Sequence, residues 1–316
     1  MNQPSPSPAD IDALIDHATQ ARWPALQSAA RGFTQRFPAH AMGWKALAMA
    51  MAAQGFDELS LAGFQRAAEL APGDADAPCY RGHALKRLQR LAEAEAAYRQ
   101  ALVLRPEHVE ALNHLADALF RQGRLAEAEA VFRQSLALQP GDAQTHANLG
   151  VMLKNQGKMA ASEAAYRQAL ALRPGFADAL ANLGVLLNRI DRRGEAEAAY
   201  RQSLEARPGH ADTLSNLGLL LMEQGRLAEA ETVCRQALAI DPGLFAARSN
   251  LLFMLNHGDD LAPAAALREA LEFGRLAAAA AAAPYTSWTH ASQPARLRVG
   301  LVSGDLRGHP VGYFLD

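Results

Sequence analysis

Hydrophobic residues recur along this chain with the period of a helix, and the pattern returns in blocks. In one block, Leu149, Leu153 and Tyr166 are spaced to fall on the apolar faces of two successive helices. The preceding block has Leu115 and Leu119 at the corresponding positions. The pattern therefore predicts that each block is an antiparallel pair, a helix A followed by a helix B, packed through their apolar faces.

Prolines mark the length of the block. Seven of them lie 34 residues apart, and they are Pro38, Pro72, Pro106, Pro140, Pro174, Pro208 and Pro242. Proline lacks a backbone donor and cannot continue a helix, so each one follows the end of a helix B. This period, with Gly150, Tyr166 and Pro174 at their places in the block, resembles the tetratricopeptide repeat.

Small residues recur where the two helices of a block must cross closely. Gly82, Gly150, Gly184 and Gly218 hold this position on helix A. A second set of glycines follows helix A, where a left-handed residue can end a helix without steric strain: Gly55, Gly123, Gly157 and Gly225. Gln89 and Asp191 replace that glycine in two blocks, so we expect looser or differently closed turns there.

The predicted fold class is all-α, a right-handed superhelix of tetratricopeptide repeats with a short α/β segment at its C-terminal end. We expect a disordered N-terminus at 1–9, a degenerate capping repeat at 10–40, six repeats at 41–244, a terminal half-repeat with an Ala-rich helix at 245–283, and at 284–316 a linker followed by a β-loop-α unit. Such a superhelix has a concave groove lined by its A helices, and such grooves usually bind peptides or other proteins.

Asparagines form a ladder along the A helices. Asn148, Asn182, Asn216 and Asn250 are 34 residues apart, and His114 holds the equivalent place one repeat earlier. An asparagine side chain both donates and accepts hydrogen bonds, so a row of them can bind the backbone of an extended peptide without reading its sequence. The alternative is that each asparagine bonds the neighbouring helix and serves repeat packing.

Acidic residues lie four positions before the ladder, and they are Asp76, Glu110, Asp178 and Asp212, with Gln144 interrupting the row. They could attract basic or polar side chains of a bound peptide. Equally, acids at the start of a helix stabilise the helix dipole.

Composition narrows the possible partners. The formal charge of −2 offers no basic field for nucleic acid, and no apolar run reaches the roughly 20 residues that span a bilayer. We therefore expect a cytoplasmic protein that binds neither nucleic acid nor membrane. Cys79 and Cys234 lack the spacing of metal ligands, so two buried or half-buried thiols are expected, with no disulfide and no metal site. The helix B residues Arg99, Arg133, Arg167, Arg201 and Arg235 are expected on a solvated convex face.

The C-terminal segment carries a second resemblance. Residues 297–303 read as a buried strand, 304–309 as a glycine-bearing loop and 311–315 as the start of a helix. This run, with Asp305 and His309, resembles the opening of the catalytic domain in the bacterial-type O-linked N-acetylglucosamine transferase family. In that family tetratricopeptide repeats precede a GT-B glycosyltransferase that uses UDP-GlcNAc as its sugar donor.

The resemblance implies an active-site position for His309 and acceptor-peptide binding by the asparagine ladder. Because the chain given stops at Asp316, before most of a GT-B domain, we expect that it does not itself transfer sugar and holds no cofactor. The leading hypothesis is the acceptor-binding part of such a transferase. The alternatives are an adaptor that binds partner proteins without catalysis and a purely structural scaffold.

Overall fold

The computed structural model describes residues 5–257 and 263–280, and this part of the chain contains sixteen α-helices and no strand. The helices before the regular repeats are α1 (Pro8–Thr19) and α2 (Trp23–Arg36). The regular A helices are α3 (Ala41–Ala53), α5 (Asp76–Arg87), α7 (Val109–Arg121), α9 (Ala143–Asn155), α11 (Ala177–Arg189), α13 (Ala211–Glu223) and α15 (Phe245–His257). The B helices are α4 (Asp57–Leu70), α6 (Leu91–Leu104), α8 (Leu125–Leu138), α10 (Met159–Leu172), α12 (Arg193–Ala206) and α14 (Leu227–Ile240).

The chain divides into two compact units, residues 1–262 and 263–316. Only α16 (Pro263–Ala280) is described in the second unit. The predicted strand, loop and helix at 297–315, and His309 within them, lie outside the described residues. None of the helices in the described ranges combines the length and the apolar composition needed to cross a membrane.

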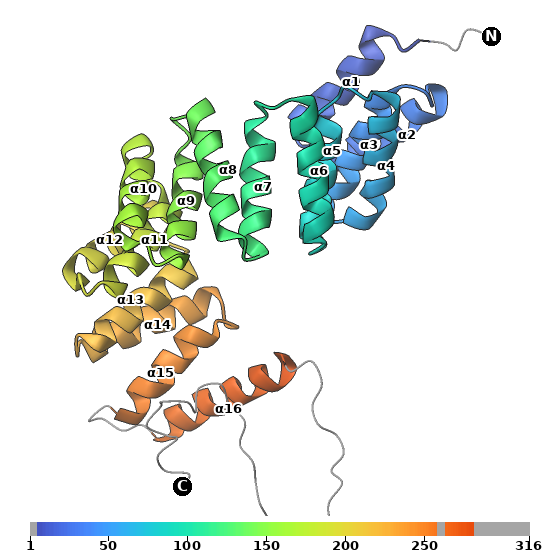
Figure 1. Cartoon of the computed structure of the whole chain (residues 1–316). Helices are drawn as coiled ribbons and strands as arrows, with labels where there is room; N and C mark the ends of the chain where they lie inside the picture. Colours follow the sequence, from blue (N-terminus) through green and yellow to red (C-terminus); the bar gives the residue numbers. More distant parts are fainter. Residues whose placement is uncertain (1–4, 258–262, 281–316) are drawn as a thin grey trace, which may run out of the picture. The chain divides into compact units, whose positions relative to one another are not determined.

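Each A helix from α3 to α13 packs on the B helix that follows it, and the pairs succeed one another along the chain (Figure 1). Each A helix from α5 to α11 also contacts the A helices before and after it, whereas no two B helices of the described residues contact each other. The A helices are therefore closer together than the B helices. This difference makes the A-helix face of the first unit its concave face.

The crossing within a pair is a glycine against an aromatic ring. A β-carbon added at Gly82 would lie 2.5 Å from the ring of Tyr98, and one added at Gly150 would lie 2.6 Å from that of Tyr166. Two other repeats use alanine with phenylalanine at these positions, and the smaller Cys234 lies against Gly218. The predicted role of the small residues in close helix crossing is confirmed.

The expectation of looser turns at Gln89 and Asp191 is wrong. Both residues adopt the left-handed conformation, with φ of 60°, beside values of 75° to 85° at the four turn glycines. The hydrogen bonds match as well, since Arg90 N donates to Leu85 O over 2.9 Å and Arg124 N donates to Leu119 O over 3.0 Å. The packing of helix A on helix B fixes the geometry of the turn. Gln89 and Asp191 therefore adopt a backbone conformation that is strained for residues other than glycine.

The N-terminal helix begins at Pro8, whereas the sequence predicted disorder as far as residue 9. Ser7 caps it, because the Ser7 hydroxyl accepts from Asp10 N while the Asp10 carboxylate accepts from Ser7 N. Proline suits the first turn of a helix, where its missing donor costs nothing. The capping repeat also departs from the regular register, since the ring of Phe33 packs against Gly43 of the next helix A.

The arginines of helix B are half exposed or more, as expected, and four of them bind a glutamate of their own helix that also reaches the next repeat. Glu95 is buried and binds both Arg99 of its own helix and Arg124 of the next repeat, the latter over 2.6 Å. The same arrangement recurs at Glu129 with Arg133 and Lys158, at Glu163 with Arg167 and Arg192, and at Glu197 with Arg201 and Arg226. We call these four sets the ion-pair ladder.

Candidate binding groove

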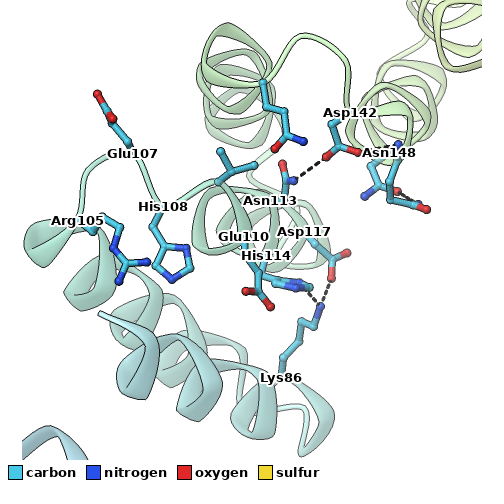
Figure 2. Close-up of a pocket in the computed structure, with 13 residues that line it drawn as sticks. Lys86, Arg105, Glu107, His108, Glu110, Asn113, His114, Asp117, Asp142 and Asn148 are labelled. Atoms are coloured by element: carbon cyan, nitrogen blue, oxygen red, sulfur yellow. Dashed lines mark hydrogen bonds and ion pairs between the residues drawn. The ribbon is translucent and has the colours of Figure 1, made fainter. Parts of the chain in front are cut away.

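The A-helix face carries a pocket of about 760 Å³ that spans three consecutive repeats (Figure 2). Lys86 of α5 lies on one side, Glu110, His114 and Asp117 of α7 form its centre, and Asn148 of α9 lies on the other side. The loop between α6 and α7 supplies Arg105, Glu107 and His108. These residues are far apart in the sequence. They meet in one pocket because the A helices that carry them stack side by side.

Lys86 organises the centre of the pocket. Its Nζ lies 3.1 Å from His114 Nδ1 and 2.9 Å from a carboxylate oxygen of Asp117, and Figure 2 shows it pointing from α5 toward both residues of α7. Burial of the Asp117 carboxyl opposes its ionisation, but the hydrogen bond and charge of Lys86 outweigh burial and lower the Asp117 pKa. Lys86 therefore holds the Asp117 carboxyl in its charged form.

A pair of histidine rings lies behind this contact. The centroids of His83 and His114 are 4.1 Å apart, with the ring planes near perpendicular. Burial, together with the neighbouring His114 and Lys86, lowers the pKa of His83 to about 3. Burial and the charge of Lys86 lower the pKa of His114 to about 4. Both imidazoles are thus neutral at pH 7.

The buried thiol of Cys79 adjoins the histidines, with its Sγ 3.7 Å from His83 Nε2. Burial raises the pKa of this thiol well above its ordinary value, so it is protonated at neutral pH. Cys79 and Cys234 are both buried and neither forms a disulfide, as the sequence predicted.

The acidic row is partly engaged within the chain. Asp76 accepts from Arg105 over 3.1 Å and lies 3.3 Å from His108 Nε2, while Asp178 forms an ion pair with Arg207. Glu110 lies 3.8 Å from His83 Nε2 and is half exposed to the pocket. Asp212 is exposed near the start of α13. Internal ion pairing is thus a third role for this row, beyond the two that the sequence indicated.

The asparagine ladder follows successive A helices, and all four members are half-buried. His114 and Asn148 are brought together in the pocket, whereas Asn182, Asn216 and Asn250 lie on later helices outside it. Asn148 accepts from Gln144 of its own helix over 3.1 Å, a bond that joins no repeats. Asn250, in contrast, donates over 3.5 Å to Ser215 O of the preceding helix A. The ladder's role in peptide binding stays a prediction.

The histidine cluster was missed by the sequence analysis. His83 is not part of the ladder, and the repeat alignment places it with Asp117, not with another histidine. The available signal was the spacing of two pairs, Cys79 with His83 and Glu110 with His114, each four residues apart and so on one helix face. Only the side-by-side packing of α5 on α7 brings the two pairs together.

Comparison with family models supports the repeat pattern. A tetratricopeptide repeat model matches residues 81–143 and 189–244, and a second tetratricopeptide repeat model matches residues 143–176. The chain contains tetratricopeptide repeats. No match to a glycosyltransferase family accompanies them among these findings, and no curated protein matches the sequence.

Solved structures also match this chain. A chain of the APC/C hetero-tetramer Cut9–Hcn1 matches with a TM-score of 0.66 and 20% identity over 77% of this chain and 48% of that one. PilF of Pseudomonas aeruginosa matches with a TM-score of 0.58 and 19% identity over 66% of this chain and 95% of that one. YrrB, a tetratricopeptide repeat protein with an unusual peptide-binding site, matches with a TM-score of 0.45 and 22% identity over 58% of this chain and 95% of that one.

These identities are low, so the likeness shows the fold alone. The chain spans about half the length of the Cut9–Hcn1 chain that it matches. The tetratricopeptide part of the predicted fold is confirmed, while the transferase family received no support from these comparisons.

Proposed function

We propose that the chain is an adaptor that binds an extended segment of a partner protein along the concave face of its A helices. The observation that carries this proposal is the pocket across α5, α7 and α9, in which His114 and Asn148 lie one repeat apart. Tetratricopeptide repeats expose such a face in many protein-binding modules, and the mode of binding follows from the residues that line it.

The asparagine ladder is proposed to bind the backbone of that segment. Its four members are half-buried, so they can reach a ligand while their neighbours hold them in place. Gln144 of the same helix holds the Asn148 side chain by a hydrogen bond. This bond favours a role in ligand binding for Asn148 over a role in joining two repeats. The bond from Asn250 to Ser215 O favours the packing role at that end of the ladder, so we expect Asn148 to contribute most.

The charges of the pocket indicate a basic or polar side chain in the bound segment. Four carboxylates, Glu107, Glu110, Asp117 and Asp142, face two cations, Lys86 and Arg105. Lys86 is engaged by Asp117, and Arg105 by Asp76 outside the pocket lining. The carboxylates Glu107 and Glu110 are the exposed ones and are proposed to attract a lysine or arginine of the partner.

Peptide titration tests the backbone-binding role. Fluorescein-labelled peptides would be selected on the intact protein from a random library, and their affinities measured by fluorescence anisotropy at fixed salt. Replacing Asn148, Asn182, Asn216 and Asn250 by alanine is expected to weaken unrelated peptides together by at least about tenfold, since each lost hydrogen bond contributes about 0.5–1.5 kcal/mol.

The control variant is Arg133→Ala with Arg167→Ala, on the B helices. These side chains are 63% and 56% exposed and do not line the groove pocket, so peptide affinity is expected to stay unchanged. Unchanged affinity in the fourfold asparagine variant, or an equal loss in the arginine control, would show that the ladder serves only repeat packing. A separate variant, Glu107→Gln with Glu110→Gln, is expected to weaken only the peptides that carry basic residues.

A narrower version of this function makes the groove the acceptor-binding part of a protein O-GlcNAc transferase. It is supported by the asparagine ladder, with its spacing of 34 residues, and by the residues around His309 that resemble the family. It ranks second because tetratricopeptide repeats alone do not require a transferase. Incubating the chain with radiolabelled UDP-GlcNAc and a selected Ser-containing peptide tests for transfer. We expect none from this chain, and label incorporation that disappears in His309→Ala would reverse that ranking.

A further inference from the structure

Two neighbouring A helices each present a pair of metal-ligating side chains on the same side. Helix α5 contributes Cys79 and His83, and helix α7 contributes Glu110 and His114. Residues four apart lie one above the other on a helix, so each pair projects from a single face. The contact of α5 with α7 makes these two faces meet.

The donor atoms of three of these residues converge. Glu110 Oε1 lies 3.8 Å from His83 Nε2, and the rings of His83 and His114 are 4.1 Å apart between centroids. One ligand atom from each of His83, Glu110 and His114 lies within 4.8 Å of the other two. Side-chain oxygen and nitrogen ligands sit about 2 Å from Zn²⁺, so closing this set around an ion requires movements of roughly 1 Å.

We propose that His83, Glu110 and His114 bind a divalent transition-metal ion on the wall of the groove. Two imidazoles and one carboxylate suit Zn²⁺, and three protein ligands leave a coordination position open for water or for a ligand group. His83 and Glu110 come from different repeats, so the ion would also join them. Glu110 and His114 line the pocket, which gives the ion a path from solvent.

Two neighbouring groups bear on the site. Lys86 Nζ lies 3.1 Å from His114 Nδ1, so binding through Nε2 of His114 requires the Nδ1–H tautomer and turns Lys86 toward Asp117 alone. Lys86 therefore competes with the metal. Cys79 and His108 form a second set with Glu110, but Asp76 lies 3.3 Å from His108 and the Cys79 thiol is buried, so we assign the ion to the two-histidine set.

Calorimetric titration of the untagged, chelator-treated chain with Zn²⁺ tests the proposal. We expect saturable binding at one site. His83→Gln with His114→Gln is expected to lower the Zn²⁺ affinity of that site by at least about tenfold. Loss of a group that only orients a metal ligand already lowers affinity by about that factor. Lys86→Met is expected to tighten Zn²⁺ binding. The matched control is His146→Gln with His210→Gln, in α9 and just before α13, which should leave Zn²⁺ affinity unchanged.

Circular dichroism and thermal melting establish that each variant is folded. If the double histidine variant does not fold, Glu110→Gln replaces it, because that side chain is 48% exposed and its loss should weaken Zn²⁺ to the same degree without unfolding the repeat. Absence of Zn²⁺ binding by the wild-type chain, or equal affinity in Glu110→Gln or in the folded histidine variant, would overturn the proposal. Peptide affinity measured with a chelator present separates this site from the peptide-binding role.

Discussion

Gly184 of α11 lies directly against the ring of Tyr200 of α12, so that a β-carbon added at Gly184 would meet the ring at 2.6 Å. Tyr200 is buried and belongs to the core of its repeat. Side chains in a buried core are closely packed, so this contact is expected to set how closely helices A and B approach.

We predict that Gly184→Leu destabilises the protein by roughly 1–3 kcal/mol, because the larger side chain overpacks the crossing. Urea denaturation followed by circular dichroism measures the effect. The control is Gly194→Leu in the same repeat, where an added β-carbon meets nothing within 4 Å. Leucine is a better helix former than glycine, so Gly194→Leu should not lower stability. An equal loss in both variants would mean that the crossing is not its cause.

The turn after α5 offers a stabilising substitution. Gln89 holds φ of 60°, a conformation that costs a non-glycine residue about 1–2 kcal/mol. Gln89→Gly is therefore expected to raise the free energy of unfolding by about 0.5–1 kcal/mol, part of the gain being offset by the greater freedom of glycine in the unfolded chain.

The reverse exchange is the control for the turn. Gly157→Gln places glutamine at φ of 78°, with no side chain or backbone within 4 Å of the new β-carbon, so it should destabilise by a similar amount. Chemical denaturation measures both variants. If Gln89→Gly lowers stability, the Gln89 side chain contributes a contact that outweighs its backbone strain.

The ion-pair ladder predicts a position-dependent cost for removing a glutamate. Glu95 is buried, accepts from Gln122 over 2.9 Å and from Arg124 over 2.6 Å, and has a pKa that these bonds lower against the opposing effect of burial. Glu95→Ala is expected to cost about 1–3 kcal/mol, since Arg124 and Gln122 lose their partner between repeats.

Glu127 provides the comparison, because it pairs with Arg124 from an exposed position on the same helix turn. Glu127→Ala should leave stability nearly unchanged, as exposed ion pairs contribute little. Thermal melts at two salt concentrations measure both variants, and the Glu95 effect should persist at high salt. Equal effects of the two substitutions would place the ladder among ordinary surface ion pairs.

The buried histidines predict a loss of stability in mild acid. The pKa of His83 is about 3 and that of His114 about 4 in the folded protein, below the 6.5 of an unfolded histidine. The unfolded chain therefore binds protons that the folded chain does not as pH falls below 6.5, so the stabilising contribution present above pH 6.5 is lost on acidification. Between pH 7 and pH 5 each histidine accounts for roughly 1–2 kcal/mol.

Urea denaturation at pH 7 and pH 5, with a chelator present, measures this dependence. Most carboxylates remain ionised in that window, which isolates the histidines. His83→Gln with His114→Gln should lose less stability than the wild type over the same interval. A pH dependence identical in the two proteins would show that these imidazoles take up protons in the folded state.

Most of the helical architecture could be predicted from the sequence, because a pattern that is weak in one repeat becomes clear when it recurs in every repeat. A proline every 34 residues ends each helix B, and glycines at one position on helix A demand close approach, so the helix pairs and their crossings followed from local chemistry. The turn at Gln89 was misjudged because the local preference of that residue is overridden by packing of the flanking helices. The ion-pair ladder was half visible, because the helix B arginines repeat plainly in the sequence. Each ladder glutamate pairs with the arginine four residues later in its own helix, and with a cation 29 residues later in the next repeat that the sequence did not point to.

The chemistry of the groove, by contrast, was decided by tertiary structure. The alignment of repeats brings identical positions into rows, so the sequence predicted the asparagine ladder and the row of acids. His83, Glu110 and His114 hold different positions in their repeats, and their meeting depends on the rotation of α5 against α7 and on side-chain torsions. Spacing along the chain determined the helices; the contacts between helices, which depend on every side chain packed between them, determined which polar groups share a buried place.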